Sequence, residues 1–530
     1  MNLSALVLRH AVHKPDDLAL VVPTLSPDGG QYDEATLTFG ALGQRVSEAM
    51  AGLADQGLER GDRVILMAPL STDLYALLLG LLASGLSAVF VDTGMGKDKI
   101  LEAIDDARAQ AIVSVRALLK YRWLVGPLRR LRHYSADSSG WGVRPLSDLF
   151  GVHDGPPPRE TAATHADDHA LITFTSGSTG RPKGADRTQG LLVAQHLALA
   201  DHFPAEDGEV DMPCFPVVTL HNLCCGVPTV LPAVDFKAPA SVNPAFVFEQ
   251  IGRWGVTRMS GAPAYIARLV DDLERRQVTE TRIRQLGVGG APTPITLCER
   301  IAAVFPQTEA QVIYGSTEAE PIASVDMGEI VRTKSDAPRL GHLVGTVAHA
   351  ATVALVDLPD PAPDLDERGV VPYRVAHGEP GELVVSGDHV NRAYLDNPTA
   401  TRANKLYTPD GVVWHRTGDV ASVDAQGRLW LRGRVNDLVR HQGRAVHPLP
   451  IEADLASRAG VRRVALINLA SQAEAVLAYE GEAPASELTD ALEALGLEGV
   501  AVLSVPRIPT DYRHQSKIDR PTLRAQLERA

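Results

Sequence analysis

The sequence predicts an α/β fold with two domains of unequal size. Helical and strand patterns alternate through the first 150 residues, which is typical of a parallel sheet with helices on its faces. At 530 residues the chain is also too long for one ordinary core. We therefore predict a large N-terminal domain at residues 1–435, made of parallel-sheet α/β layers with a β-rich part. A small C-terminal α/β domain is expected at residues 436–530.

Hydrophobic patterning justifies the elements of the first layer. Residues 39–56 carry an amphipathic helical pattern, and the apolar run at residues 63–67 indicates a buried strand. Residues 74–91 are uncharged and nearly long enough to span a membrane. Because Ser84 and Gly85 interrupt this run, we predict a buried helix, a glycine stop and a buried strand instead.

The later segments supply the β-rich part and the C-terminal domain. Residues 424–427 have the composition of a hairpin turn between two strands. In the last hundred residues, strands are predicted at 464–468, 475–479 and 500–505, with a helix at 485–495.

Composition and charge limit the classes of function. The hydrophobic content of 45% and charged content of 22% are those of a soluble globular protein. A net charge of −14 argues against nucleic-acid binding, which requires a basic balance or face. The 4 cysteines form no Cys-x-x-Cys pair, so neither a disulfide framework nor a zinc site is predicted, and a cytoplasmic location is expected. Residues 1–18 lack the apolar core of a signal peptide.

One stretch of the chain is predicted to hold phosphates. A short buried strand at 171–174 is followed by a loop of small and hydroxyl-bearing residues: Thr175, Ser176, Gly177, Ser178, Thr179 and Gly180. Glycine lets backbone N–H groups approach an anion closely, and Lys183 adds a cation. The loop is not the Walker motif, because Arg181 and Pro182 separate its last glycine from the lysine.

In two further stretches, a predicted strand ends in a turn. They are Leu-Gly-Val-Gly-Gly-Ala-Pro at 286–292 and Gln-Val-Ile-Tyr-Gly-Ser-Thr-Glu at 311–318. Ligands bind at the carboxyl ends of parallel strands. If these strands share a sheet with the strand at 171–174, all three point at one crevice.

The stretch at 171–184 resembles the phosphate-loop signature of the adenylate-forming superfamily of acyl-CoA synthetases, adenylation domains and luciferases. The stretches at 286–292, 311–318, 417–419 and 511–520 resemble the same superfamily, in the expected order. The resemblance implies an ATP- and Mg²⁺-dependent ligase that converts a carboxylic acid to an acyl-adenylate and releases pyrophosphate.

The resemblance also assigns roles to individual residues. Tyr314 looks like the aromatic residue that stacks on adenine, Thr317 like an α-phosphate contact, and Asp419 like the acceptor of the ribose hydroxyls. Glu318 looks like the Mg²⁺ carboxylate. The nucleotide-binding set it implies is Thr175, Ser176, Gly177, Ser178, Thr179, Gly180, Lys183, Gly290, Ala291, Pro292, Tyr314, Gly315, Ser316, Thr317, Asp419 and Arg434.

The catalytic residues implied by the resemblance are Thr175, Glu318 and Lys517. In Ser-Lys-Ile at 516–518, Lys517 looks like the lysine that a mobile small domain brings to the reacting phosphate, where negative charge builds in the transition state. The pivot position of that movement, usually Asp or Lys in the family, is Asn436 here.

Three local stretches, at 90–96, 413–430 and 513–518, look closest to the β-lactone synthetases of olefin biosynthesis. That likeness implies a long-chain 2-alkyl-3-hydroxy acid whose own hydroxyl displaces AMP. A fatty acyl-CoA ligase is the first alternative. A nucleotide-binding regulator without activity is the second, and the joint presence of Lys183, Glu318, Asp419 and Lys517 argues against it.

Two positions depart from the family's pattern, and two further stretches have no assigned role. The histidine usual after the lysine loop is Gln189, and the pocket histidine position holds Thr219, with His221 nearby. The apolar run at 217–230 suits an alkyl pocket. The basic, apolar stretch at 121–132 is expected to be a solvated helix face, with a membrane-surface, acidic-partner or pathway-enzyme contact as the alternative.

Overall fold

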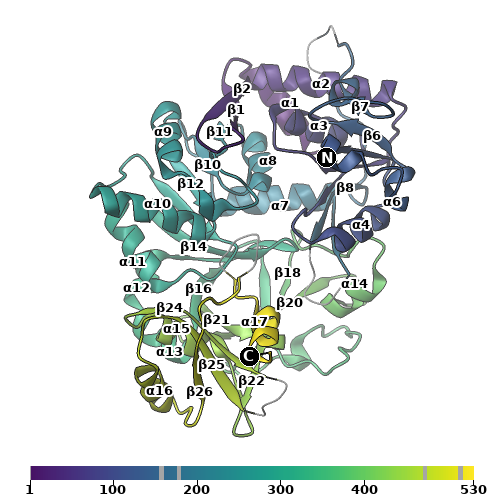
Figure 1. The fold of residues 1–530 in the computed structure, drawn as a ribbon. Helices are drawn as coiled ribbons and strands as arrows, with labels where there is room; N and C mark the ends of the chain where they lie inside the picture. The colour runs from purple at the N-terminus through teal and green to yellow at the C-terminus, as the bar shows by residue number, and fades with distance from the viewer. Residues whose placement is uncertain are drawn as a thin grey trace.

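The computed structural model describes residues 2–153, 155, 160–175, 181–469, 474–510 and 517–529. It confirms the α/β class: sheets with helices packed on them form a large N-terminal part, and a smaller α/β part follows at the C-terminus (Figure 1). In Figure 1 this C-terminal part, coloured yellow-green, lies below the teal and purple body. The domain boundary at 435/436 stays a prediction, although β21 ends close to it, at Arg434.

The first sheet has the strand order β7-β6-β5-β3-β4-β8-β9. Its strands run parallel except β9, which returns antiparallel to β8. The bounds are β3 Arg63–Met67, β4 Ser87–Val91, β5 Ala111–Ser114, β6 Arg132–Ser135, β7 Arg144–Pro145, β8 His169–Thr175 and β9 Lys183–Thr188. Helices α1 Ser4–His13, α2 Phe39–Asp55, α3 Thr72–Ala83 and α4 Lys97–Asp106 accompany this part of the chain.

The uncharged run at 74–91 forms the predicted helix, stop and strand. Ser71 caps α3 by accepting a hydrogen bond from the Leu74 N–H, and Gly85 turns the chain with φ +74° before β4. The helix is buried from Leu74 to Ala83. Within the part of the chain that the structure describes, every helix is too short or too polar to cross a bilayer.

The second sheet holds most of the remaining strands. Its order is β17-β18-β20-β21-β16-β15-β14-β13-β12-β10-β11-β1-β2, with β19 against β20. The central strands β10 Asp211–Pro213, β12 Arg258–Gly261, β13 Gln285–Gly289 and β14 Glu309–Ser316 are parallel. The flanking strands are β1 Leu18–Leu25, β2 Tyr32–Thr38, β11 Thr229–Val230, β15 Ala319–Asp326, β16 His342–Val347, β17 Thr352–Val356, β18 Gly381–Ser386, β19 Lys405–Tyr407, β20 Val413–Val423 and β21 Leu429–Arg434.

The three strands that precede the predicted ligand-binding turns do not share one sheet. Strand β8 lies in the first sheet, whereas β13 and β14 lie in the second. Hydrophobic patterning predicts each strand but carries no information about which strands pair, because pairing depends on contacts far apart in sequence.

The helices that follow β9 cover the second sheet. In Figure 1, α9 to α12 form a layer along its left side. Their bounds, with those of two neighbouring helices, are α7 Gln189–His202, α8 Pro216–Cys225, α9 Pro244–Trp254, α10 Pro263–Arg276, α11 Ile295–Val304 and α12 Met327–Arg332. Four further short helices are α5 Arg116–Leu119, α6 Gly126–Arg129, α13 Ala337–Leu340 and α14 Pro398–Asn404.

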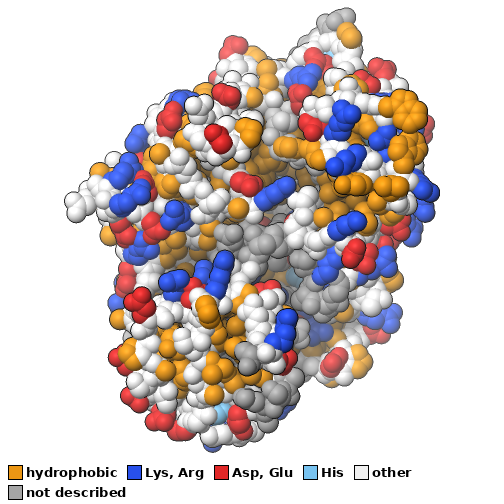
Figure 2. All heavy atoms as spheres, in the orientation of Figure 1, with side chains coloured by type: hydrophobic (Ala, Val, Ile, Leu, Met, Phe, Trp, Pro, Cys, Tyr) orange, Lys and Arg blue, Asp and Glu red, His pale blue; other side chains and the backbone are white. Residues whose placement is uncertain are grey.

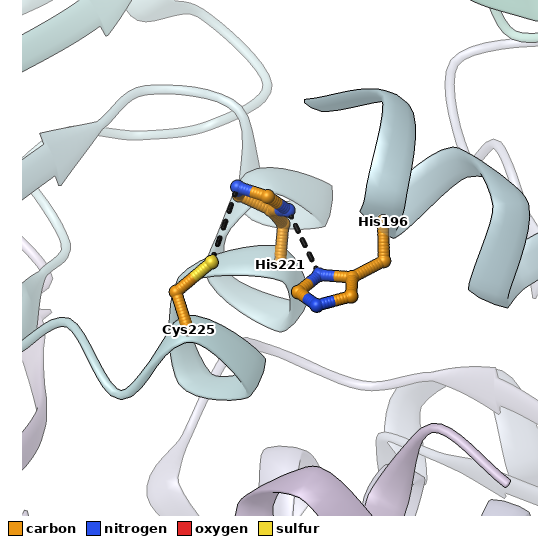
Figure 3. A group of neighbouring side chains, drawn as sticks. All are labelled: His196, His221 and Cys225. Carbon is orange, nitrogen blue, oxygen red and sulfur yellow. Dashed lines mark hydrogen bonds between the residues drawn. The ribbon is translucent and has the colours of Figure 1, made fainter. Parts of the chain in front are cut away.

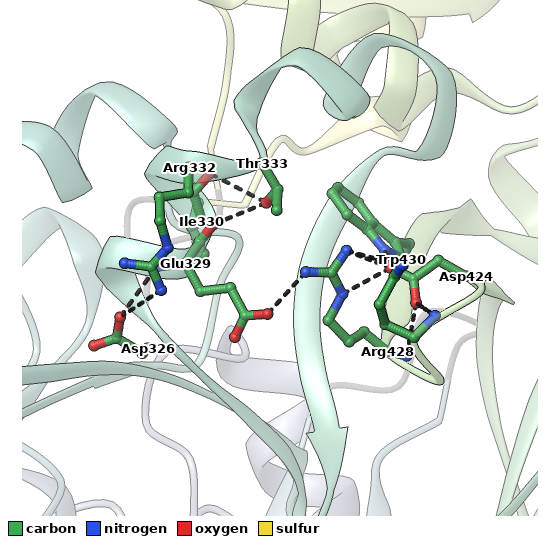
Figure 4. Close-up of polar contacts among 9 residues, drawn as sticks. Asp326, Glu329, Ile330, Arg332, Thr333, Asp424, Arg428 and Trp430 are labelled. Atoms are coloured by element: carbon green, nitrogen blue, oxygen red, sulfur yellow. Dashed lines mark hydrogen bonds and ion pairs between the residues drawn. The ribbon is translucent and has the colours of Figure 1, made fainter.

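A hairpin turn connects β20 to β21, as predicted for residues 424–427. The Asp424 carboxylate accepts hydrogen bonds from the indole N–H of Trp430, at 2.8 Å, and from Arg428. Arg428 also pairs with Glu329 of α12 at 2.8 Å (Figure 4). These contacts anchor the hairpin whose strands carry Asp419 and Arg434.

The C-terminal part contains the predicted strands and helix. Its sheet has the order β24-β25-β26, next to the two-stranded β22-β23. The bounds are β22 Val439–His441, β23 Arg444–Val446, α15 Pro448–Ala456, β24 Val461–Asn468, β25 Ala475–Gly481, α16 Ala485–Ala494, β26 Ala501–Ser504 and α17 Arg520–Leu527.

The predicted helix face at 121–132 is wrong. The structure has two single-turn helices instead, α5 and α6, separated by turns. Gly126 and Pro127 start α6, and Pro127 has no N–H to bond the carbonyl four residues before it, where its ring would also clash, so a helix cannot continue unbroken through this position.

Candidate active site

A cavity of about 1560 Å³ lies where the large part meets the C-terminal part. Its walls include Thr175, Gly290, Ala291, Pro292, Tyr314, Gly315, Ser316, Thr317, Glu318, Asp419, Arg434 and Lys517. Among the predicted site residues that the structure describes, Lys183 alone is not in this wall. Although β8 and β14 belong to different sheets, the predicted residues thus meet at one cavity.

A buried arginine joins the two sheets at this cavity. Arg187 of β9 donates to Thr173 Oγ1 of β8 at 2.9 Å and to the carbonyl of Thr317 at 3.1 Å. Asn391 links the same elements, since its N–H donates to the Glu318 carbonyl at 2.7 Å. These bonds fix the turn after β14 against the strand that leads into the predicted phosphate loop.

The base of the predicted phosphate loop is a pair of facing residues. Thr175 and Lys183 lie opposite each other where β8 and β9 pair antiparallel. The loop residues Ser176, Gly177, Ser178, Thr179 and Gly180 lie outside the described residues. Arg181 is turned away from Lys183 and pairs with Asp106 of α4 at 2.6 Å.

Three predicted residues form a connected group at the nucleotide end. The Tyr314 hydroxyl donates to Asp419 Oδ2 at 2.7 Å, and Arg434 Nε lies 3.0 Å from Asp419 Oδ1. The register of β20 and β21 places Asp419 directly opposite Arg434. Burial, together with the Asp419 carboxylate, raises the pKa of Tyr314 well above its usual value, so its hydroxyl stays a hydrogen-bond donor.

The turn after β13 offers backbone to the same space. Gly290 adopts φ +81°, a conformation that glycine accepts without strain, and Ala291 and Pro292 follow it along the wall. Near them, the buried hydroxyl oxygen of Ser316 has no hydrogen-bond partner among the described residues. A buried hydroxyl without a partner is costly, so it fits a site that binds a polar ligand.

The Glu318 carboxylate is held by residues that the sequence interpretation missed. The Tyr394 hydroxyl donates to Glu318 Oε1 at 2.8 Å. The ammonium groups of Lys183 and Lys405 lie 5.5 and 5.7 Å from the centre of the Tyr394 ring. Lys405 is buried and donates to the Asn391 carbonyl. Lys405 is the first residue of the short strand β19, so the sequence carried no signal of its burial, which only the fold reveals.

This arrangement sets the charges around Glu318. Burial opposes ionisation of the carboxyl, but the neighbouring Lys405 ammonium and the hydrogen bond from Tyr394 favour the carboxylate, and the pKa of Glu318 is lowered overall. Burial lowers the pKa of Lys405 to about 7 and that of His415 to about 3. Glu318 therefore stays an anion at neutral pH, as a ligand for a hard cation must.

Lys517 reaches the cavity from the C-terminal part. It is the only lysine in residues 436–530 and lies in the cavity wall. The residues beside it are fixed: Ile518 pairs with Thr510, and Arg520 donates to Glu452 at 2.7 Å. Arg520 also pairs with Asp437 at 3.3 Å, which ties the lysine segment to the residues just after β21.

The other end of the cavity is more polar than the apolar run at 217–230 suggests. Val217 and Val218 of α8 face the cavity, but so do His221, Asn222 and the half-buried Arg258. The remaining apolar side chains of α8 belong to the protein core. Helical periodicity explains the difference, because only one face of α8 can meet the cavity.

His221 is the centre of a buried chain of side chains. Its Nδ1 lies 3.0 Å from His196 Nδ1, and its Nε2 lies 3.5 Å from Cys225 Sγ (Figure 3). The three residues are close enough together to suggest a metal site. However, His196 and Cys225 contact opposite nitrogens of one ring, so a single ion cannot take all three ligands in this arrangement. Burial lowers the pKa of His221 to about 3, which keeps the ring neutral.

The fold thus brings the predicted nucleotide-binding residues to one cavity between the large N-terminal part and the smaller C-terminal part. Residues 7–395 match the family of AMP-binding enzymes. The chain is 33% identical to the olefin beta-lactone synthetase of Stenotrophomonas maltophilia, with 98% of this chain and 97% of that protein covered. It is 31% identical to the olefin beta-lactone synthetase of Xanthomonas campestris, with 98% and 96% covered. The chain belongs to the AMP-binding enzyme family and is an adenylate-forming ligase.

Other proteins resemble the chain in sequence or in fold. A feruloyl-CoA synthase of Amycolatopsis is 29% identical, with 83% of this chain and 82% of that protein covered. The anthranilate CoA ligase AuaEII in complex with anthranoyl-AMP superposes with a TM-score of 0.80 at 20% identity, covering 100% and 97% of the two chains. ATP-bound MatB of Rhodopseudomonas palustris superposes with a TM-score of 0.78 at 21% identity, covering 100% and 99%. Adenylate-forming enzymes use ATP, and the nucleotide in MatB is ATP.

Proposed function

We propose that the protein activates a long-chain 2-alkyl-3-hydroxy acid as its acyl-adenylate and then closes that acid to a β-lactone. In the first step a carboxylate oxygen bonds to the α-phosphorus of ATP and pyrophosphate leaves. In the second step the 3-hydroxyl oxygen bonds to the acyl carbon, AMP leaves, and the hydroxyl proton passes to solvent. The nucleophile is tethered to the carbonyl that it attacks, so no second substrate is needed.

The observation that carries this proposal is the end-to-end likeness to two olefin beta-lactone synthetases. The likeness to the feruloyl-CoA synthase covers less of the chain.

The nucleotide is assigned to the end of the cavity that carries Tyr314. In this proposal Tyr314 stacks on adenine beside the Gly290–Pro292 turn, and Asp419 accepts the ribose hydroxyls with Arg434 as its cationic neighbour. Thr317 contacts the α-phosphate. The phosphates are assigned to Thr175, Ser176, Gly177, Ser178, Thr179, Gly180 and Lys183, with Gly315 and Ser316 beside them.

Glu318 is proposed as the Mg²⁺ ligand. Mg²⁺ binds nucleotide sites through one or two carboxylates plus phosphate oxygens, and Glu318 is a half-buried carboxyl whose pKa is lowered, with the Lys405 ammonium and the Tyr394 hydroxyl favouring its ionised form. The ion would neutralise phosphate charge when it is bound. Lys517 is proposed to stabilise the charge that develops on the α-phosphate, and Thr175 to contact the same phosphate.

The second candidate is a fatty acyl-CoA ligase, in which a coenzyme A thiolate attacks the acyl carbon. The likeness to the feruloyl-CoA synthase favours it. The two candidates differ in whether AMP release needs coenzyme A.

An AMP-release assay tests the proposal with a matched pair of acids. The 3-hydroxy acid and its 3-deoxy analogue, each with ATP and Mg²⁺, should both support ATP–pyrophosphate exchange. Without coenzyme A, only the 3-hydroxy acid should release AMP through many turnovers, because only it carries a nucleophile. If AMP release from both acids requires coenzyme A, the ligase candidate replaces the lactone proposal.

A further inference from the structure

A patch of large apolar side chains is exposed near α5 and α6, away from the residues that line the cavity. The exposed fractions are 47% for Tyr121, 55% for Trp123, 79% for Leu124 and 89% for Trp141. We call these four residues the aromatic patch. Figure 2 shows hydrophobic side chains interspersed with lysine and arginine side chains in this region, at the right of the view.

The aromatic patch is not an incomplete part of the core. The same segments send other side chains inward, since Leu119, Leu128 and Leu131 are buried against the first sheet. The exposed set is therefore a second apolar face, on residues whose neighbours already complete the packing. Two exposed tryptophans within a few ångströms of each other are unusual for a surface that contacts only water.

A buried arginine holds the patch in place. Arg122 is 8% exposed, donates to the Leu119 carbonyl at 3.1 Å and also donates to the Trp141 carbonyl. Its guanidinium lies 5.0 Å from the centre of the Trp123 ring. The Trp123 and Trp141 rings are consequently 6.5 Å apart, on segments separated by 18 positions in the sequence. The two rings form one preorganised surface.

Positive charge surrounds the patch. Between residues 116 and 141 there are six basic residues and one acidic residue, in a chain whose net charge is −14. Lys120, Arg129 and Arg130 are exposed there. Of these three, Arg130 forms an ion pair with Asp105, at 4.0 Å. The one acidic residue of this stretch, Asp137, accepts hydrogen bonds from the Ser135 hydroxyl and the Arg116 N–H.

We propose that this patch binds the surface of an anionic lipid bilayer. Tryptophan and tyrosine favour the interface between headgroups and acyl chains, and Leu124 would enter the acyl boundary. The surrounding cations would contact anionic headgroups. A bilayer fits this combination of side chains better than an acidic protein does, because an acidic partner would leave the exposed leucine and indole rings without apolar contacts. The inference uses none of the proposed catalytic residues.

Vesicle binding by the full-length protein tests the proposal without substrate. Two kinds of vesicle are compared: phosphatidylcholine alone, and an equal mixture of phosphatidylcholine and phosphatidylglycerol. The chain has 5 tryptophans, of which Trp123 and Trp141 are exposed whereas Trp414 and Trp430 are buried and Trp254 is half-buried. Tryptophan emission and its quenching by brominated acyl chains therefore report mainly on the patch.

The proposal predicts binding to the mixed vesicles, with a blue shift and quenching, and much weaker binding to phosphatidylcholine. W123A/W141A should weaken binding at least about tenfold through lost apolar contact. K120A/R129A/R130A should weaken binding about a hundredfold, because the loss of each cation should weaken it about fivefold. The matched control R332A/R339A removes two exposed arginines elsewhere and should bind as the wild type does.

Several results would overturn the proposal. They are failure of the wild type to bind the mixed vesicles, binding that both patch variants retain, and equal loss in the control variant. Binding to polyglutamate without binding to vesicles would identify an acidic protein as the partner instead. Circular dichroism and ATP–pyrophosphate exchange confirm that each variant is folded, and the vesicle result does not depend on whether the product is a lactone.

Discussion

The Tyr314 hydroxyl and the Asp419 carboxylate are joined by a hydrogen bond of 2.7 Å, across 105 positions of sequence. The bond connects the end of β14 to β20 and leaves the second carboxylate oxygen to Arg434. The carboxylate proposed to bind ribose is thus oriented by the residue proposed to stack on adenine. Four predictions follow from this arrangement and from the contacts of Glu318 and Lys517.

Substituting Tyr314 by phenylalanine should weaken ATP binding and leave the rate at saturating ATP nearly unchanged. The ring remains for stacking, but Asp419 loses one of its two partners. A hydrogen bond to a charged group contributes about 1.5–3 kcal/mol, so the KM for ATP should rise about tenfold or more. ATP–pyrophosphate exchange over a range of ATP concentrations measures it.

Y134F is the matched control, because the hydroxyl of Tyr134, in β6, donates to Gln56 at the end of α2, and Tyr134 does not line the cavity. Its KM for ATP should equal that of the wild type. An unchanged KM in Y314F would show that Asp419 is oriented without Tyr314.

Substituting Glu318 by glutamine should lower the exchange rate at least about a hundredfold, a loss typical of removing one charge-stabilising group from an active site. The variant keeps the shape of the side chain but not the charge proposed to hold Mg²⁺. A titration with Mg²⁺ should show half-maximal activity at a much higher concentration. E493Q, which changes an exposed glutamate of α16 outside the cavity wall, is the control. Identical Mg²⁺ curves for E318Q and the wild type would remove Glu318 from the metal site.

Lys405 should make stability depend on pH. Burial lowers its pKa to about 7, while the unfolded chain keeps the ordinary value of 10.5. Between these values the unfolded state binds the extra proton, so this group makes the free energy of unfolding rise with pH, by at most about 1.4 kcal/mol per unit. In K405M the contribution is absent.

Thermal unfolding of the wild type and K405M, followed from pH 7 to pH 9, measures this difference. The melting temperature of the wild type should rise relative to that of K405M as the pH increases. Parallel curves would contradict the assigned environment of Lys405.

Substituting Lys517 by alanine should impair adenylation but not the step after it. Exchange should fall about a hundredfold or more, because the lysine is proposed to act on phosphate charge. When the acyl-adenylate is supplied directly, AMP release should proceed at the wild-type rate. K237A, which removes an exposed lysine outside the cavity wall, should change neither step. Equal loss in both steps for K517A would mean that the lysine supports the site as a whole.

Local patterns predicted the parts of the fold that depend on local physics. Strands β3 and β8 and helices α2 and α3 follow from periodicity, and the hairpin turn at 424–427 follows from turn chemistry. The helix expected at 121–132 failed because the effect of Pro127 outweighed the apolar spacing. The pairing of β8 with β9 rather than with β13 could not be predicted, because pairing is decided by tertiary contacts.

The residues of the candidate site likewise fall into two groups: those that the sequence predicted and those that only the fold reveals. Residues in compact signatures, such as Tyr314, Glu318 and Lys517, were predicted and line one cavity. The residues that support them were not predicted. Tyr394 and Arg187 lie far from Glu318 and Thr317 in sequence, and only the fold shows that their side chains meet. The loop at 176–180 and the stretch at 511–516 lie outside the described residues, so their roles stay predictions.

Product analysis with a 2-alkyl-3-hydroxy acid that carries heavy oxygen in its 3-hydroxyl tests the central claim most directly. The acid is incubated with ATP and Mg²⁺, with and without coenzyme A, and the products are weighed by mass spectrometry. Lactone closure predicts a product one water lighter than the acid that keeps the label as its ring oxygen and forms without coenzyme A. A thioester that forms only with coenzyme A, or a product that has lost the label, would contradict the claim.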